Sequence, residues 1–171
     1  PSDARGGQVL ADITKDRRIK SVAITYTNND YGKGLADVYA AAVKAHGIKV
    51  TVVTAHEDGK ADYSSEVATL AAAGGDAVAV IGYLDQGGKG IIQGSLDSGA
   101  FDRFILSDGM IGDALTDTFG KDLNKSFGSL PGSMNKKTAG TFTSVAKAAG
   151  IDSSGPYTGE SYDAAALIVL A

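Results

Sequence analysis

The sequence SVAITYTNNDYGKGLADVYAAAVKAHG, residues 21–47, joins two hydrophobic periodicities. It opens with an apolar, β-branched run over residues 22–26, which is typical of a strand buried on both faces. After a polar turn, apolar side chains recur every three or four residues, which indicates a helix with one buried face. Asn29 or Asp30 can cap the start of this helix, and Gly47 favours its end. The stretch is therefore predicted to form a strand–loop–helix unit.

The same alternation of strand and helix repeats along the chain. Further apolar runs start near residues 49, 76, 103 and 127, roughly 25–30 residues apart, with helical patterns between them. This spacing favours parallel strands joined by right-handed crossovers. The runs are continuous rather than alternating, which favours a sheet covered by helices on both faces. The predicted fold is therefore α/β, a three-layer αβα arrangement around a doubly wound, mainly parallel five-stranded sheet.

The alternation stops after Pro131-Gly132-Ser133. Two helical patterns, over residues 135–149 and 160–171, follow without a strand pattern between them. A Gly/Pro/Ser stretch at such a change is typical of a crossing between domains. We therefore expect one lobe over residues 1–132, and a crossing with two helices over residues 133–171.

The composition limits the classes of function. The 171 residues are 43% hydrophobic and 21% charged, as in ordinary globular proteins. A formal net charge of −4 disfavours nucleic acid as a partner. The sequence contains no cysteine, which excludes disulfides, thiolate chemistry and cysteine-built zinc sites. The absence of cysteine fits an exported bacterial protein. No apolar run is long enough for a transmembrane helix. No signal peptide is visible at the start, and the last helical pattern stops without a cap, so the chain is interpreted as a fragment.

Motifs for enzymatic chemistry are incomplete. A dinucleotide fingerprint starting at Gly32 fails because its third glycine position holds Asp37. A phosphate loop over residues 82–89 lacks the required Lys and the following Ser or Thr. The two histidines, His46 and His56, are interpreted as solvated surface residues. No pattern in the sequence indicates an enzyme, a metal site or a cofactor.

Several short motifs resemble those of the leucine/isoleucine/valine-binding protein family, in that family's order and spacing. The set covers most of the chain and is specific as a set, although each motif alone is modest. The matching segments are Asp30–Ala36 (DYGKGLA), Ala61–Ser64 (ADYS), Ile81–Tyr83 (IGY), Leu106–Gly109 (LSDG), Ser154–Tyr157 (SGPY) and Tyr162–Ala165 (YDAA).

The resemblance implies a type 1 periplasmic-binding fold and a transport function. Proteins of that family are the periplasmic substrate-binding components of amino-acid ABC transporters, with a membrane permease as partner. They capture a small amino acid between two lobes. The resemblance implies that residues 1–132 form the second lobe, with half of the site, and that residues 133–171 hold helices belonging to a missing first lobe. Alternatives are a ligand-sensing domain of a receptor or transcription regulator with the same fold, and an α/β enzyme.

Four residues are candidates for ligand binding. Tyr31 follows a predicted parallel strand, where ligands of open α/β sheets sit. The resemblance implies the same role for Tyr83 and Tyr157, and it implies that Asp108 pairs with the α-ammonium group of the ligand. Three of the four have a structural alternative: an ordinary loop tyrosine for Tyr31, core packing for Tyr83 and a helix cap for Asp108.

The resemblance also bears on the last two helices. Without a first lobe, their apolar side chains (Phe142, Val145, Leu167 and Ile168) would lack a packing partner. We expect these helices to fold back on the lobe or to pair with a second copy of the chain, giving a homodimer.

Overall fold

The computed structural model describes residues 2–132 and 136–170, and it divides into two compact units, Pro1–Ser129 and Leu130–Ala171. Each unit is described by itself. Ser133, at the end of the predicted crossing, and residue 135, at the predicted start of a helix, lie outside the described residues. The assignment of the units to two different lobes stays a prediction.

The first unit is built on a five-stranded sheet in which all neighbouring strands are parallel. The strand order is β2-β1-β3-β4-β5. The chain thus starts in the sheet at β1, adds β2 on one side and then returns to add β3 to β5 on the other. The strands are β1 (Ser21–Thr27), β2 (Lys49–His56), β3 (Ala77–Ile81), β4 (Phe104–Leu106) and β5 (Phe127–Gly128).

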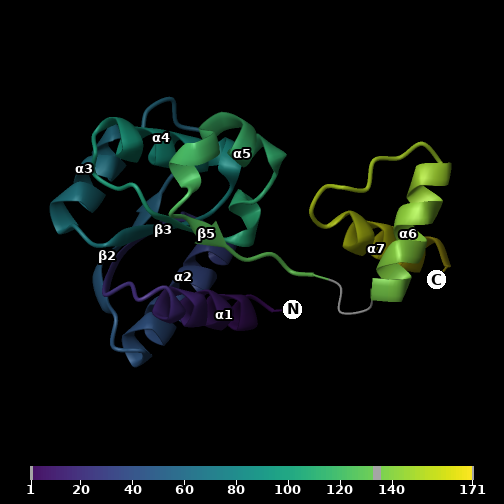
Figure 1. Ribbon diagram of the computed structural model, residues 1–171, viewed down its shortest axis with the longest axis horizontal. Helices are drawn as coiled ribbons and strands as arrows, with labels where there is room; N and C mark the ends of the chain where they lie inside the picture. Colours follow the sequence, from purple (N-terminus) through teal and green to yellow (C-terminus); the bar gives the residue numbers. More distant parts are fainter. Residues whose placement is uncertain (1, 133–135, 171) are drawn as a thin grey trace. The chain divides into compact units, whose positions relative to one another are not determined.

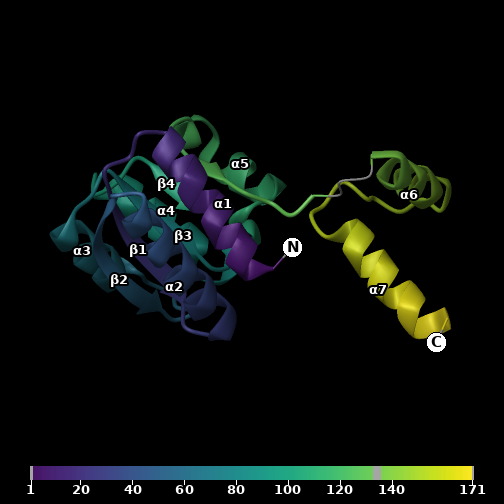
Figure 2. The ribbon, with the colours of Figure 1, turned by 90° about the horizontal axis from the view of Figure 1, so that it is seen from below.

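Helices cover both faces of this sheet, which confirms the predicted three-layer, doubly wound fold (Figures 1 and 2). On one face lie α1 (Asp3–Asp16) and α2 (Asp30–Ala45), whose apolar side chains share a core cluster with β1. A second cluster joins the opposite face to three other helices: α3 (Ser64–Ala73), α4 (Lys89–Asp97) and α5 (Asp113–Phe119). Short helical turns η1 (Leu84–Gly88), η2 (Asp108–Met110) and η3 (Gly120–Leu123) connect the main elements.

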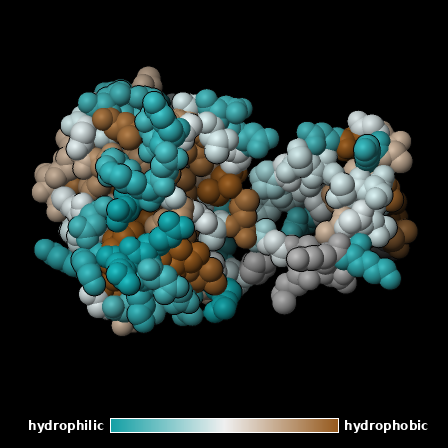
Figure 3. Space-filling view, in the orientation of Figure 1, coloured by the Kyte–Doolittle hydropathy of each residue, from teal (hydrophilic) through white to brown (hydrophobic). Residues whose placement is uncertain are grey.

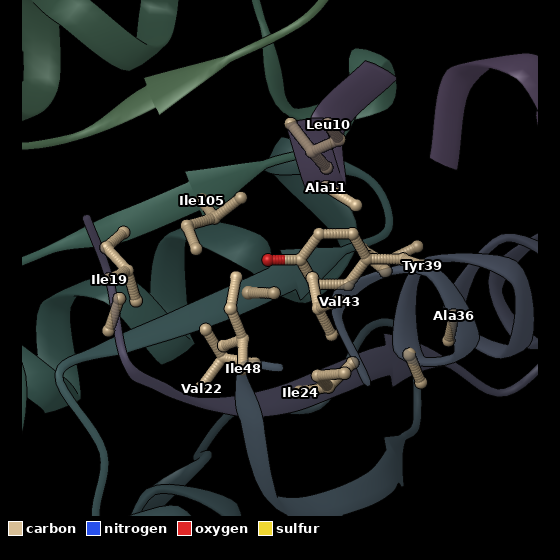
Figure 4. Close-up of a cluster of buried hydrophobic side chains, with 14 of the residues drawn as sticks. Leu10, Ala11, Ile19, Val22, Ile24, Ala36, Tyr39, Val43, Ile48 and Ile105 are labelled. Carbon is tan, nitrogen blue, oxygen red and sulfur yellow. The ribbon is translucent and has the colours of Figure 1, made fainter. Parts of the chain in front are cut away.

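Tyr39 is the largest fully buried side chain of the first cluster, and its ring lies at the centre of that cluster (Figure 4). Its hydroxyl lies 3.0 Å from Oγ1 of Thr14, so the one polar atom of the ring has a partner. Thr14 in turn donates to the carbonyl oxygen of Leu10 at 2.7 Å. Burying a side chain of this size contributes about 1.5–3 kcal/mol. The cluster therefore fixes α1 and α2 on the strands that lead to the candidate site.

The prediction that both histidines are solvated surface residues was wrong for His56. His56 is the last residue of β2 and only 1% exposed, and its Nδ1 lies 2.9 Å from Oγ1 of Thr25. The strand continues to the histidine because Thr25, on the neighbouring strand, supplies a polar partner inside the core. His46 is half-buried, and its Nε2 lies 2.7 Å from Oδ1 of Asp12 on α1.

The second unit contains the helices α6 (Lys136–Ala148) and α7 (Thr158–Leu170). The rings of Phe142 and Tyr162 meet at a centroid distance of 5.3 Å and join the two helices. Phe142 is half-buried by this contact, whereas Val145, Leu167 and Ile168 are exposed as expected. Figure 3 shows apolar side chains on the surface of this unit. None of the helices in the described ranges has both the length and the apolar character needed to cross a bilayer.

Candidate functional site

Three of the four predicted site residues follow the carboxyl ends of neighbouring strands. Tyr31 lies in the first turn of α2 after β1, Tyr83 follows β3, and Asp108 follows β4. Because β1, β3 and β4 are adjacent and parallel, these ends meet at one edge of the sheet. The topology therefore brings together residues that are far apart in the sequence.

The side chains of these residues are in direct contact. The rings of Tyr31 and Tyr83 are stacked, with centroids 5.4 Å apart and planes inclined by 29°. The Tyr31 hydroxyl donates a hydrogen bond to Oδ1 of Asp108 at 2.6 Å. All three residues are half-buried, so the cluster is built into the fold and still reaches the surface.

Ser107, which the sequence analysis did not single out, belongs to the same cluster. It is 1% exposed, and its Oγ accepts a hydrogen bond from the backbone N–H of Gly82 at 3.2 Å. The Tyr31 hydroxyl lies 3.3 Å from the same oxygen. Ser107 thus links the ends of β3 and β4 beneath the tyrosine. The sequence feature that could have identified Ser107 is a small polar residue directly after the continuous apolar run of β4.

Two close backbone approaches hold the cluster in place. A Cβ added at Gly32 would lie 2.2 Å from the carbonyl oxygen of Thr27, so the chain can turn from β1 into α2 this tightly only with glycine. A Cβ added at Gly109 would lie 2.4 Å from the carbonyl oxygen of Gly82. Glycine is therefore required directly after Tyr31 and directly after Asp108, because any side chain at these positions would clash with a backbone oxygen.

Asn29 caps α2, which settles the choice left open by the sequence. Its side-chain oxygen accepts a hydrogen bond from the N–H of Gly32 at 2.8 Å. Such a cap stabilises a helix by about 1 kcal/mol. Here the cap also fixes the first turn of α2, which carries Tyr31.

The environment of Tyr31 keeps its phenol protonated at neutral pH. Burial raises the pKa of Tyr31 above its ordinary value, and the hydrogen bond to Asp108 raises it further. Tyr31 is therefore a stable donor, and one oxygen of Asp108 is fixed as its acceptor. A carboxylate held in this way beside aromatic faces suits a small ligand that has a cationic group and an apolar part.

Tyr157 belongs to the second unit, where it lies just before α7 with a φ of 63° and an exposed fraction of 37%. Its place in the site stays a prediction. Within residues 2–132 and 136–170, no group of three or more His, Asp or Glu side chains is arranged to hold a metal ion.

Comparisons with known proteins point to one family. A sequence profile described as periplasmic binding protein matches residues 1–171. The Leu/Ile/Val-binding protein homolog 3 of Brucella melitensis is 36% identical over 87 residues, which are 50% of this chain and 24% of that protein.

Solved structures agree with this match at the level of the fold. The periplasmic binding protein type 1 of Bordetella pertussis superposes with a TM-score of 0.73 at 22% identity, covering 85% of this chain and 39% of that one. A leucine binding protein of Thermotoga maritima superposes with a TM-score of 0.66 at 18% identity, covering 83% of this chain and 43% of that one. The chain therefore spans less than half the length of these matched proteins.

Proposed function

The chain belongs to the periplasmic binding protein family, and we propose that it is part of the substrate-binding component of an ABC importer. Its ligand is a small amino acid with a branched-chain-like side chain, captured in a cleft between two lobes and released unchanged. The location is the periplasm, and the partner of the complete protein is a membrane permease. The names of the Brucella and Thermotoga relatives support the ligand class.

The observation that carries this proposal is the contact of Tyr31 with both Tyr83 and Asp108. In the proposed complex, the Asp108 carboxylate pairs with the α-ammonium group through a charge-assisted hydrogen bond. The two stacked rings provide an apolar wall for the rest of the ligand. No covalent step is needed, so the function is binding without catalysis.

We further propose that this chain supplies half of the site. It covers 39% and 43% of the two solved relatives, so the groups that hold the ligand carboxylate are assigned to residues outside this chain. Tyr157 is a further proposed ligand-binding residue. Half a site neither binds the carboxylate nor excludes water, so the 171-residue chain is expected to bind amino acids weakly or undetectably by itself.

A second copy is the proposed partner of the exposed apolar residues of α7. Leu167 and Ile168 are 72% and 80% exposed, and the next two residues, Val169 and Leu170, are also apolar and exposed. Apolar surface of this kind is typical of a protein interface. We propose a homodimer formed through the helices of the second unit.

Calorimetric titration of the complete natural chain with leucine, isoleucine, valine and other common amino acids tests the ligand proposal. We expect at least one of them to bind and to raise the melting temperature by mass action. Asp108→Asn should weaken this binding by about tenfold or more. Asp117→Asn, which changes an exposed carboxylate on α5 in the same way, should leave it unchanged. Binding that is equally strong in Asp108→Asn, or no binding by any amino acid, would contradict the proposal.

A further inference from the structure

Tyr63 lies outside the proposed site, yet its hydroxyl joins two loops next to it. This residue precedes α3 and is 6% exposed. Its hydroxyl lies 2.9 Å from the carbonyl oxygen of Glu57 and 2.7 Å from that of Gln86, and it accepts a hydrogen bond from the N–H of Lys60 at 3.1 Å. Glu57 and Lys60 belong to the loop after β2, whereas Gln86 belongs to η1. One buried hydroxyl therefore ties the two loops together.

The loop that contains Gln86 begins directly at Tyr83. Its first helical turn is closed by the N–H of Gly88, which donates to the carbonyl oxygen of Tyr83 at 3.0 Å. The carbonyl oxygen of Gln86 also accepts from the N–H of Gly59 at 2.5 Å. The π-helical form of η1 is rare, and single turns of this kind are frequent at functional sites. The conformation of η1 therefore depends on the contacts that the Tyr63 hydroxyl and the N–H of Gly59 make with the carbonyl oxygen of Gln86.

The ring of Tyr63 also fills the space beside this turn. A Cβ added at Gly90 would lie 2.4 Å from Cδ2 of Tyr63, and one added at Gly87 would lie 2.9 Å from its hydroxyl oxygen. On another side, a Cβ at Gly88 would lie 2.3 Å from Sδ of Met110, at the end of η2. The turn after Tyr83 is thus confined between Tyr63 and Met110.

We propose that Tyr63 is a positioning residue for Tyr83. It acts indirectly, because the hydrogen bonds of its hydroxyl go to Glu57, Lys60 and Gln86 rather than to Tyr83. Its hydroxyl fixes η1, and η1 fixes the backbone from which the Tyr83 ring stacks on Tyr31. The proposal rests on the proposed function, because it assigns Tyr63 a contribution to ligand affinity through the ordering of that site. Without the hydroxyl, η1 gains conformational freedom. Part of the binding free energy of a ligand is then used to order η1, which lowers the affinity.

Tyr63→Phe removes the hydroxyl and keeps the ring. The matched control is Tyr39→Phe, which removes another buried hydroxyl with a hydrogen bond, on the opposite face of the sheet. Amide hydrogen exchange and NOEs between the rings of Tyr31 and Tyr83 are measured on the ligand-free chain. In Tyr63→Phe we expect the amides of Gly59 and Gly88 to exchange roughly two- to tenfold faster than any global loss of stability explains, and the NOEs to weaken. Tyr39→Phe should change neither.

In the complete natural chain, Tyr63→Phe should also weaken amino-acid binding by about two- to tenfold, with Tyr39→Phe as the control. Unchanged local exchange and unchanged NOEs in Tyr63→Phe would overturn the positioning role, whatever the chain binds. If the exchange and the NOEs change as expected but no amino acid binds even the unaltered chain, the role in ordering Tyr83 stands and the proposed function fails. If Tyr63→Phe alters the amide exchange but binds amino acids as tightly as the unaltered chain, the proposed contribution of Tyr63 to ligand affinity is overturned.

Discussion

The hydroxyl of Tyr31 donates to the carboxylate of Asp108 at 2.6 Å, across 77 positions of the sequence. This hydrogen bond joins the start of α2 to the end of β4, two elements that β1 and β3 bring to the same edge of the sheet. It therefore contributes to the stability of the first unit and also sets the orientation of the carboxylate that is proposed to bind the ligand.

Tyr31→Phe should lower the free energy of unfolding by about 1–2 kcal/mol, because a half-buried acceptor loses a charge-assisted donor. Urea denaturation followed by far-UV circular dichroism measures the change. The control is Tyr26→Phe on β1, a half-buried tyrosine of the same face. Equal effects of the two substitutions would show that the Tyr31 hydroxyl contributes nothing specific.

Gly32→Ala should destabilise the chain by about 2–3 kcal/mol, because its Cβ would lie 2.2 Å from a backbone oxygen that has little freedom to move. Gly34→Ala, two residues further along α2, meets nothing within 4 Å and should stabilise the chain by about 0.5–1 kcal/mol. Thermal and urea denaturation of both variants measure these opposite signs. A gain of stability in both variants would mean that helix propensity outweighs the close approach to Thr27 and would contradict the steric role of Gly32.

His56 should make the stability of the first unit dependent on pH. Burial lowers the pKa of His56 in the folded state, although the nearby carboxylates of Asp58, Glu66 and Glu57 act in the opposite direction. The remaining neighbours facing the ring are uncharged: Thr25 at Nδ1, Tyr63 edge-on, and the backbone of Gly82 and Gly87. The folded protein therefore favours the neutral imidazole.

The sign follows from proton linkage. The unfolded chain, with a His pKa of about 6.5, takes up a proton that the folded chain resists. The stability contributed by neutral His56 is therefore present above about pH 6.5 and is lost as the pH falls through the folded-state pKa. The slope from this residue reaches at most about 1.4 kcal/mol per pH unit. Urea denaturation between pH 5 and 8 should show this slope in the unaltered chain and a smaller one in His56→Gln; identical slopes would contradict the assignment.

The sequence predicted the fold well because the fold depends on local patterns. Continuous apolar runs and helical spacing fixed the order of strands and helices, and parallel pairing then placed Tyr31, Tyr83 and Asp108 at one edge. What could not be predicted depends on contacts between distant segments. Ser107 matters through a backbone N–H that is 25 positions away, and His56 is buried because Thr25, 31 positions away, gives it a partner. No periodicity records such contacts.

The apolar residues at the end of α7 predict self-association of the chain. Four consecutive residues of α7, Leu167 to Leu170, are 72% to 84% exposed, and apolar side chains of this kind are stabilised when a partner removes them from water. We therefore expect the 171-residue chain to self-associate, with a mean mass in sedimentation equilibrium that rises with concentration.

The double substitution Leu167→Lys and Ile168→Lys should abolish this self-association, because two charges would have to be buried in an apolar contact. Ala41→Lys with Ala45→Lys adds the same charge at exposed positions of α2 in the first unit and should leave the self-association intact. A chain that stays monomeric at all concentrations would contradict the proposed homodimer. Self-association that persists in the α7 variant would contradict an interface at Leu167 and Ile168 and would place it on other exposed apolar side chains, such as Val145 and Ile151.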